Sequence, residues 1–345
     1  MSWQGIHEHD PIVEAFRQCI GQGRLASAYL FVGPLGVGKR TFAYQLAQSL
    51  LCDSNPETAV DACGTCDSCR QVSAGSHPDV ISVQKEDDEN FIPIEAFIGD
   101  REHRNQTGLC RDIGLKPFSG RRKFAIIDDA DHLNIEGANS LLKTLEEPPL
   151  GSVLILITTS ELLQLPTIRS RCQIVRFSPL SEQVVREVLE DIVGGPDFEA
   201  ADVAKSSAGS MRLAQQLTDE TLSEFRTGLL NRLSAAPMDS IELGRKAIEF
   251  AEDVGTDTFL RRARVRIMLS MAIDFFRQLL RKCSQVDIRG DKPMQAAIAA
   301  TSHCTASSAA DCIEACLDAR EFIDRNANLT ALLLWWAEEM TKRRR

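Results

Sequence analysis

The sequence predicts an α/β protein with a parallel sheet, followed by a helical C-terminal part. Up to about residue 178, short apolar segments alternate with amphipathic ones, and after Pro179 no strand pattern remains. Alternating strands and helices are typical of a parallel sheet with helices on both faces. A chain of 345 residues accommodates two or three domains. We expect an α/β domain at 1–178, a small helical unit at 179–220 and long helices at 221–345.

The expected elements follow from hydrophobic periodicity. Apolar residues recur at helical spacing in residues 4–24, 41–51 and 135–147. Short apolar runs, typical of buried strands, occur at Ala28–Val32, Asp79–Val83, Phe124–Ile127, Val153–Ile157 and Gln173–Phe177. We expect residues 52–75 to form a loop and Lys85–Asn90 to form a solvated loop.

A glycine-rich segment follows the first expected strand. Gly33, Gly38 and Lys39 have the spacing GxxxxGK, and Gly36 lies between them. Such a loop directs backbone N–H groups at phosphate oxygens, and its lysine reaches the β and γ phosphates. The sequence therefore predicts a nucleotide-binding phosphate loop.

The position after this lysine departs from the usual pattern. Ser or Thr there supplies a hydroxyl to Mg²⁺, but this chain has Arg40, and a guanidinium cannot ligate a metal. Thr41 comes one residue late, about 100° around the helix. Either the loop folds without nucleotide, or it binds ATP and Mg²⁺ and hydrolyses slowly.

Polar residues follow two of the expected strands. Asp128 comes where a carboxylate positions Mg²⁺, and Asp129 comes where a longer glutamate usually activates water. Because reactive geometry is sensitive to about 1 Å, the shorter Asp129 also argues against efficient hydrolysis. The two carboxylates can alternatively serve as caps of the strand end. Thr159 follows the next strand and is able to contact the γ-phosphate.

Four cysteines cluster in the expected loop. Cys52, Cys63, Cys66 and Cys69 offer four thiolates within 18 residues, two pairs of them at Cys-x-x-Cys spacing. Four soft ligands without an open position are typical of structural zinc. A redox pair or inert thiols are the alternatives. His303, Cys304, Cys312 and Cys316 also cluster, but Cys312 and Cys316 are expected to be small buried side chains in a helix.

Charge and hydropathy exclude several classes. The net charge is −10, with −12 in residues 1–221 and +2 in residues 222–345. This balance argues against an independent DNA-binding module, since such binding depends on many Lys and Arg contacts with phosphate. The first ten residues lack the pattern of a secretory signal, and no apolar run reaches about 18 residues. We therefore expect a cytoplasmic protein.

These features together resemble the bacterial clamp-loader subunits of the AAA+ class. Within that class they are more similar to the delta-prime family of DNA polymerase III than to the gamma/tau family. The resemblance covers about residues 4–220. The stretches that carry it are Ala28–Pro34, Gly38-Lys39, the four cysteines, His77–Asp79, Ile126–Asp131, Asn139–Pro149 and Ile168–Cys172.

The resemblance implies roles that the patterns alone do not give. Arg171 resembles the arginine finger that reaches ATP on a neighbouring subunit, Arg212 the sensor-2 arginine and Thr159 the sensor-1 residue. Residues 179–220 would be the lid domain, and residues 221–345 the collar of a five-subunit ring. The implied partners are the gamma/tau and delta subunits, the sliding clamp and, through the complex, primed DNA.

Two functions follow from the resemblance. In the first, the chain is a stator that donates Arg171 and helps to load the clamp during replication. In the second, it is a gamma-like ATPase that hydrolyses ATP at its own site. Arg40 and Asp129 favour the first function, and so does the chain's end at Arg345, without the long tail by which tau binds the polymerase.

Overall fold

The computed structural model describes residues 2–86, 89, 91–118, 121–193, 200–207, 209–256, 258–301, 304–325 and 327–344. They form two compact units. The first comprises Met1–Val184 with Gly209–Arg212, and the second comprises Val185–Ala208 with Leu213–Arg345. Each unit is described by itself below.

The first unit contains a five-stranded parallel sheet in the order β4-β5-β6-β3-β7. In register, Leu30 lies opposite Leu156 of one neighbouring strand and Ile174 of the other. The parallel sheet is therefore confirmed, and the predicted strands agree with the observed ones to within one residue at each end. Their bounds are β3 (Ala28–Val32), β4 (Val80–Val83), β5 (Lys123–Ile127), β6 (Ser152–Thr158) and β7 (Gln173–Arg176).

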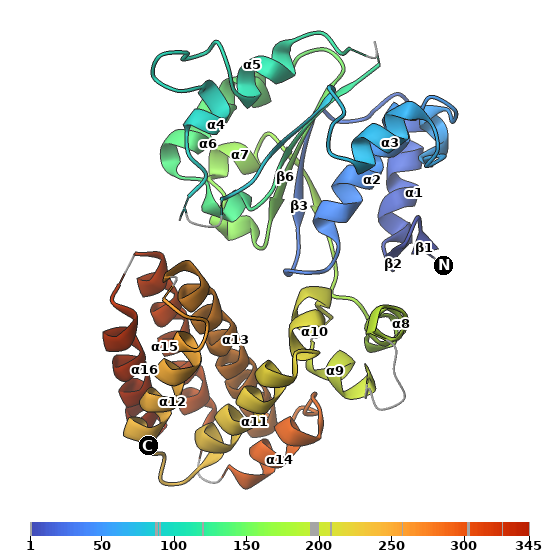
Figure 1. Cartoon of the computed structure of the whole chain (residues 1–345). Coiled ribbons are helices and arrows are strands. Elements are labelled where there is room, and N and C mark those ends of the chain that lie inside the picture. Colours follow the sequence, from blue (N-terminus) through green and yellow to red (C-terminus); the bar gives the residue numbers. More distant parts are fainter. Residues whose placement is uncertain are drawn as a thin grey trace. The chain divides into compact units, whose positions relative to one another are not determined.

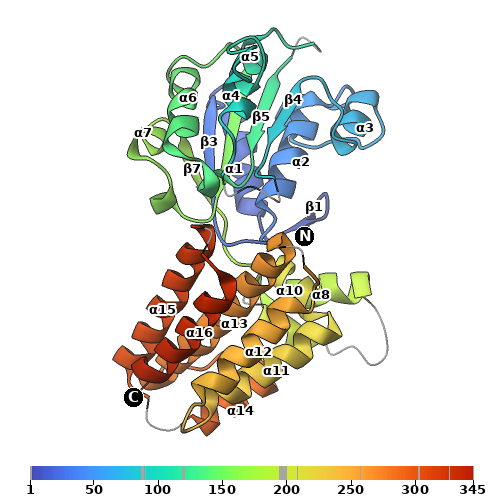
Figure 2. The same cartoon turned by 60° about the vertical axis from the view of Figure 1, so that its left-hand side comes forward.

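Helices cover both faces of this sheet, as Figures 1 and 2 show. Tyr29 and Phe31 pack with α1 (Asp10–Gly21), α2 (Lys39–Leu51) and α3 (Asp67–Ser73). Leu30 and Val32 pack on the other face. The helices there are α4 (Glu95–Ile98), α5 (Leu109–Gly114), α6 (Ile135–Glu146) and α7 (Pro166–Arg169). Because alternate residues point to opposite faces, a central strand such as β3 must be apolar throughout.

Three predictions at the local level were incomplete. Residues 4–24 do not form one helical segment, since α1 is preceded by a small antiparallel hairpin of β1 (Ser2–Trp3) and β2 (Ile6–His7). Its turn has Gln4 and Gly5 at positive φ. The expected loop at 52–75 contains a short helical turn, η1 (Glu57–Ala59), as well as α3. The helices α4 and α5 are too short to show periodicity and were not predicted.

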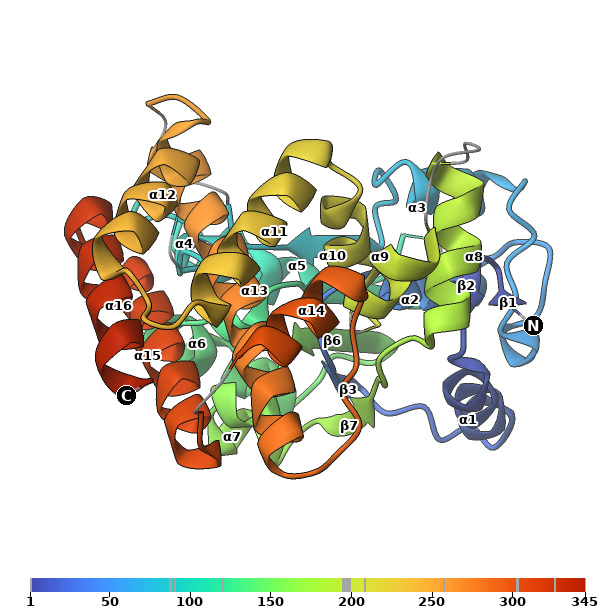
Figure 3. The same cartoon turned by 90° about the horizontal axis from the view of Figure 1, so that it is seen from below.

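The second unit is helical, which confirms the predicted C-terminal helices (Figure 3). Its core includes Trp336, Phe275 and the buried thiols Cys312 and Cys316, which confirms that these cysteines are small core residues. His303 lies outside the described residues. The helices from α8 onward are α8 (Glu182–Val193), α9 (Ala200–Ser206), α10 (Met211–Leu217), α11 (Glu220–Ser234), α12 (Ser240–Glu252), α13 (Thr258–Cys283), α14 (Lys292–Ala300), α15 (Ala306–Asp324) and α16 (Leu329–Arg343).

Among the described residues, no helix combines the length and apolarity that a membrane crossing requires. The division into a lid at 179–220 and a collar at 221–345 stays a prediction. Of the expected solvated loop, residues 87, 88 and 90 lie outside the described residues.

Candidate functional site

The turn between β3 and α2 has a backbone suited to phosphate. Gly36 and Gly38 have φ values of +74° and +94°, a region that glycine adopts without strain. The buried ammonium of Lys39 donates to the carbonyl oxygens of Gly33 at 2.6 Å and Pro34 at 2.7 Å. Burial lowers the pKa of Lys39, and the neighbouring carboxylates, Asp131 first, oppose that shift. This turn therefore gathers positive charge at the N-terminus of α2.

A short segment before and within α10 lies against the same turn. The backbone N–H of Met211 donates to the carbonyl of Gly36 at 2.9 Å. A Cβ at Gly36 would lie 2.5 Å from Ser210 Oγ and 2.7 Å from Arg212 N, so any larger residue would displace this segment. Arg212 is exposed, and its charge is near enough to Asp129 to oppose the rise in the pKa of that carboxyl. The structure thus brings Arg212 to the loop.

The acidic end of β5 lies beside α2. Asp128 Oδ1 accepts the N–H of Asp129 at 3.0 Å, and Asp128 Oδ2 is 3.1 Å from Arg40 Nη1. The same Arg40 nitrogen donates to Gln84 Oε1 at 2.5 Å. Asp129 has a φ of +51°, and burial together with the charge of Asp128 raises its pKa. Both carboxylates therefore lie at the carboxyl end of the strand, as predicted, but Asp128 is already paired with a cation.

Thr159 is held by a third carboxylate. Asp131 Oδ2 accepts from the backbone N–H of Thr159 at 2.9 Å and from its hydroxyl at 2.6 Å. The hydroxyl of Thr158 also donates to Asp131. Because β5 and β6 are neighbours, Asp131 couples the acidic strand end to the polar one.

Arg171 lies at the opposite end of the sheet from the glycine turn. It follows α7 and precedes β7, whose first residue Gln173 pairs with Tyr29 of β3. Gly33 directly follows β3 and is four residues beyond Tyr29, so about 13 Å of extended chain separates Gly33 from the level of Gln173. Arg171 is exposed, and its Nη2 is 2.6 Å from Glu146 Oε1 at the end of α6. Its Nη1 donates to the carbonyl of Thr167 at 2.9 Å.

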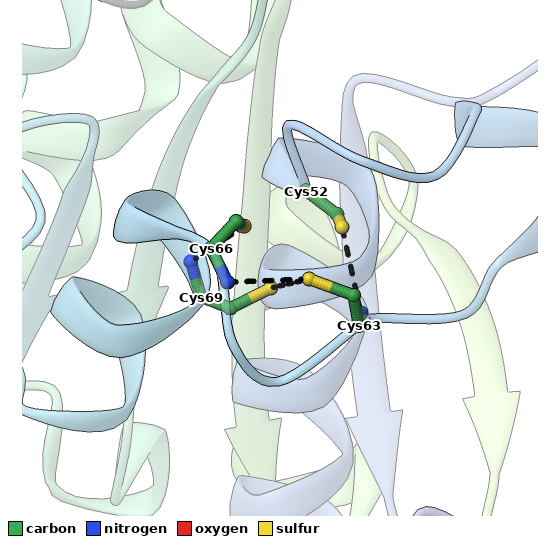
Figure 4. A group of neighbouring side chains, drawn as sticks. All are labelled: Cys52, Cys63, Cys66 and Cys69. Carbon is green, nitrogen blue, oxygen red and sulfur yellow. Dashed lines mark hydrogen bonds between the residues drawn. The ribbon is translucent and has the colours of Figure 1, made fainter.

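The four predicted cysteines form one cluster (Figure 4). Their sulfur atoms all lie within 4.8 Å of one another, and the Sγ atoms of Cys63 and Cys69 are 3.9 Å apart. Four sulfurs around one zinc at about 2.3 Å would be separated by about 3.8 Å, so the cluster fits such an ion. Cys52 follows α2, Cys63 and Cys66 come from the connecting loop, and Cys69 belongs to α3.

The surroundings of the thiols favour bound metal. Backbone N–H groups point at three of the sulfurs. The N–H of Cys63 donates to Cys52 Sγ, the N–H of Cys66 to Cys63 Sγ, and the N–H of Cys69 to Cys66 Sγ, at 3.3–3.4 Å. Hydrogen bonds from the backbone of Thr65 and Cys66 lower the pKa of Cys63 to about 5, whereas burial raises that of Cys69. A cation is the natural stabiliser of a buried thiolate, because the metal binds the deprotonated form.

Three residues near these sites were not singled out from the sequence. Gln84 holds Arg40, Glu146 holds Arg171, and Ser210 lies against Gly36. Glu146 belongs to a stretch that supports the resemblance. Its partner Arg171 is 25 residues away, and their contact depends on the packing of α6 against α7. No local spacing could have revealed these contacts.

The parallel sheet, its helices on both faces and the glycine turn after β3 define the class of the first unit, which is an α/β nucleotide-binding fold. Residues 8–181 match the sequence model of the family described as "DNA polymerase III, delta subunit". The chain belongs to this family.

Individual relatives agree with this assignment. The chain is 38% identical over 210 residues to DNA polymerase III subunit delta' of Pseudomonas aeruginosa, covering 60% of each chain. It is 34% identical over 190 residues to subunit delta' of Bacillus subtilis, covering 55% of this chain and 54% of that one. Subunit tau of Escherichia coli is 33% identical over 219 residues, or 61% of this chain and 31% of that protein. The chain thus spans no more than about 60% of these relatives.

A solved structure with similarity is a gamma subunit-related protein of DNA polymerase III from Thermotoga maritima. The identity is 16%, the TM-score is 0.42, and the match covers 96% of this chain and 99% of the other.

Proposed function

We propose that this chain is a delta-prime-like subunit of a DNA polymerase III clamp loader. In that role it would help to load the sliding clamp onto primed DNA during replication, in the cytoplasm. Its partners would be gamma/tau and delta subunits, and residues 179–220 and 221–345 would form the lid and collar of the ring. Membership of the family and the delta' relatives support this proposal.

The observation that carries the stator role is the position of Arg171. At least about 13 Å of extended chain separates it from the chain's own glycine turn, which makes it unsuited to act on a nucleotide bound there. It is exposed and tied to Glu146 by an ion pair that costs little to break. A guanidinium so placed is available to a nucleotide bound by a neighbouring subunit, where it would stabilise charge on the transferring phosphoryl group.

The chain's own nucleotide site would hydrolyse ATP slowly at most. Arg40 stands where a magnesium-binding hydroxyl is needed, and Asp129 is shorter than the usual glutamate. Lys39 and the glycines of the turn are retained, which keeps a gamma/tau-like ATPase as the alternative function. In that alternative, Asp128 and Asp129 would serve the metal and the attacking water, while Thr159 and Arg212 would sense the γ-phosphate.

We also propose that Cys52, Cys63, Cys66 and Cys69 hold a structural zinc ion. The cluster has four soft ligands and no open position, so the metal would stabilise the fold between α2 and α3 without taking part in chemistry.

An assembly experiment tests the proposed function. The chain is assayed for ATP hydrolysis alone, with a gamma/tau ATPase subunit, and with the full set of clamp-loader subunits, clamp and primed DNA. The proposal predicts negligible turnover by the chain alone and a DNA-stimulated activity that requires it in the mixture. Turnover of the isolated chain above about 1 s⁻¹, abolished by Lys39→Ala, would instead establish the gamma-like alternative.

A further inference from the structure

The magnesium position of the glycine turn contains a side chain that carries its own positive charge. Arg40 directly follows Lys39 at the start of α2, and its Nη1 bridges Asp128 Oδ2 at 3.1 Å and Gln84 Oε1 at 2.5 Å. The guanidinium also lies over the ring of Tyr44, 5.6 Å from its centre, which favours this placement. Arg40 therefore has partners on three different elements or loops.

A divalent cation does not fit this arrangement. The hydroxyl ligand is missing, because the position is an arginine and the following Thr41 is exposed. Both oxygens of Asp128 already have partners, since Oδ1 accepts the N–H of Asp129 and Oδ2 accepts from Arg40, so a metal bound there would lie beside the guanidinium. Mg²⁺ demands nearly ideal octahedral oxygen coordination, and a guanidinium held against the carboxylate would repel it.

The turn beside Arg40 nevertheless keeps the glycines and the lysine of a phosphate-binding loop. Gly36 and Gly38 have the left-handed φ values that direct backbone N–H groups inward. The buried Lys39 is held by the loop's own carbonyl oxygens, and exposed Arg212 belongs to the segment that lies on Gly36. Lys39, Arg40 and Arg212 supply three positive charges around this turn.

We propose that this site binds a nucleotide polyphosphate without a divalent cation, and that Arg40 takes the place of the metal between Asp128 and the terminal phosphate. A guanidinium suits this position because its fork can donate to a carboxylate and a phosphate together. The nucleotide then acts as a bound structural ligand rather than a substrate. This inference goes beyond the stator role, which does not require a nucleotide on this chain.

The test uses ADP as the probe and the full chain as the protein. The dissociation constant is measured by calorimetry in excess Mg²⁺ and in EDTA, for the wild type, Arg40→Thr and Arg70→Thr. Arg70 is an exposed arginine that pairs with Asp67 on α3, so its variant is a matched control. Thermal unfolding of each variant checks that the fold is intact.

We expect wild type and Arg70→Thr to bind ADP with dissociation constants that differ by less than about threefold between the two conditions. Arg40→Thr restores the hydroxyl, so it should bind at least about tenfold more tightly with Mg²⁺ than with EDTA. Wild-type binding that requires Mg²⁺, or no binding of ADP up to millimolar concentrations, would overturn the inference. Neither result bears on Arg171, whose role is measured at the neighbouring subunit.

Discussion

Replacing Cys69 by serine should weaken metal binding by the four-cysteine cluster and lower the stability of the first unit. Cys69 is fully buried on α3, and its carbonyl accepts a hydrogen bond of 2.8 Å from Gln48 of α2. The same Gln48 amide donates to Ser73 at 2.7 Å, so α3 is joined directly to the helix that begins at the glycine turn. A serine hydroxyl is not ionised at neutral pH, and the cluster would lose one of its four anionic ligands.

The expected loss follows from mass action. A ligand present at 100 to 1,000 times its dissociation constant stabilises the folded state by about 2.7–4.1 kcal/mol. For a cooperative unit of roughly 150–250 residues, each kcal/mol shifts the melting temperature by about 2–4 °C. Cys69→Ser should therefore lower the melting temperature of the first unit by about 5–16 °C.

Metal analysis and calorimetry on the same samples measure this prediction. The wild type should contain one zinc per chain and Cys69→Ser far less. Cys19→Ser is the matched control, because Cys19 is an exposed thiol on α1 and is not one of the four clustered cysteines, so its loss should leave both values unchanged. A Cys69→Ser protein with full zinc content, or with the wild-type melting temperature, would refute the reasoning.

Two further predictions concern charges at the ends of the sheet. Asp129→Asn should raise the melting temperature at pH 8, because burial and the charge of Asp128 raise the pKa of this carboxyl, so its ionised form destabilises the fold, and asparagine tolerates the positive φ. A raised pKa means that the folded protein favours the protonated carboxyl. The wild type should therefore regain the stability that it lacks relative to Asp129→Asn as the pH falls through that pKa. An equal gain at pH 8 and pH 4 would contradict the electrostatic cause. Glu146→Gln should free Arg171 and raise the ATPase of the assembled complex by up to about fivefold, since exposed ion pairs contribute about 0–1 kcal/mol. A loss of activity instead would mean that Glu146 orients Arg171 rather than competing for it.

Features encoded by local spacing were predictable from the sequence. The interior strands β3, β5 and β6 are fully buried, so their apolar runs, such as Ala28–Val32, stand out from the amphipathic segments. The glycine turn and the four cysteines are set by spacings of a few residues, and the structure shows both as compact local arrangements. The identity of the metal and the roles of the site residues stay predictions.

Contacts set by tertiary packing were not predictable. Asp131 lies beside Thr159 because β5 and β6 are neighbours in the sheet, and the spacing of the two residues in the sequence does not specify that contact. Arg40 could be recognised as unable to ligate a metal, but its pairing with Asp128 depends on where α2 lies over the sheet. The helix α3 was missed because its seven residues are too few to show a helical period.

Replacing Arg171 in the assembled complex tests the central claim most directly. Arg171→Ala, Arg171→Lys and a matched control, Arg176→Ala, are each assembled with partner subunits, clamp and primed DNA. Arg176 is also an exposed arginine in an ion pair, with Glu161. Gel filtration and DNA-stimulated ATPase are measured on the same samples.

We expect all three variants to assemble, because exposed arginines contribute little to stability. Arg171→Ala should lower the ATPase by at least about tenfold, since arginine fingers in other phosphoryl-transfer systems contribute 10³–10⁵ in rate. Arg171→Lys should recover little of it, because a point charge lacks the planar fork, and Arg176→Ala should retain full activity. Full ATPase activity and clamp loading by a properly assembled Arg171→Ala complex would contradict the claim that this chain supplies an arginine finger to its neighbour.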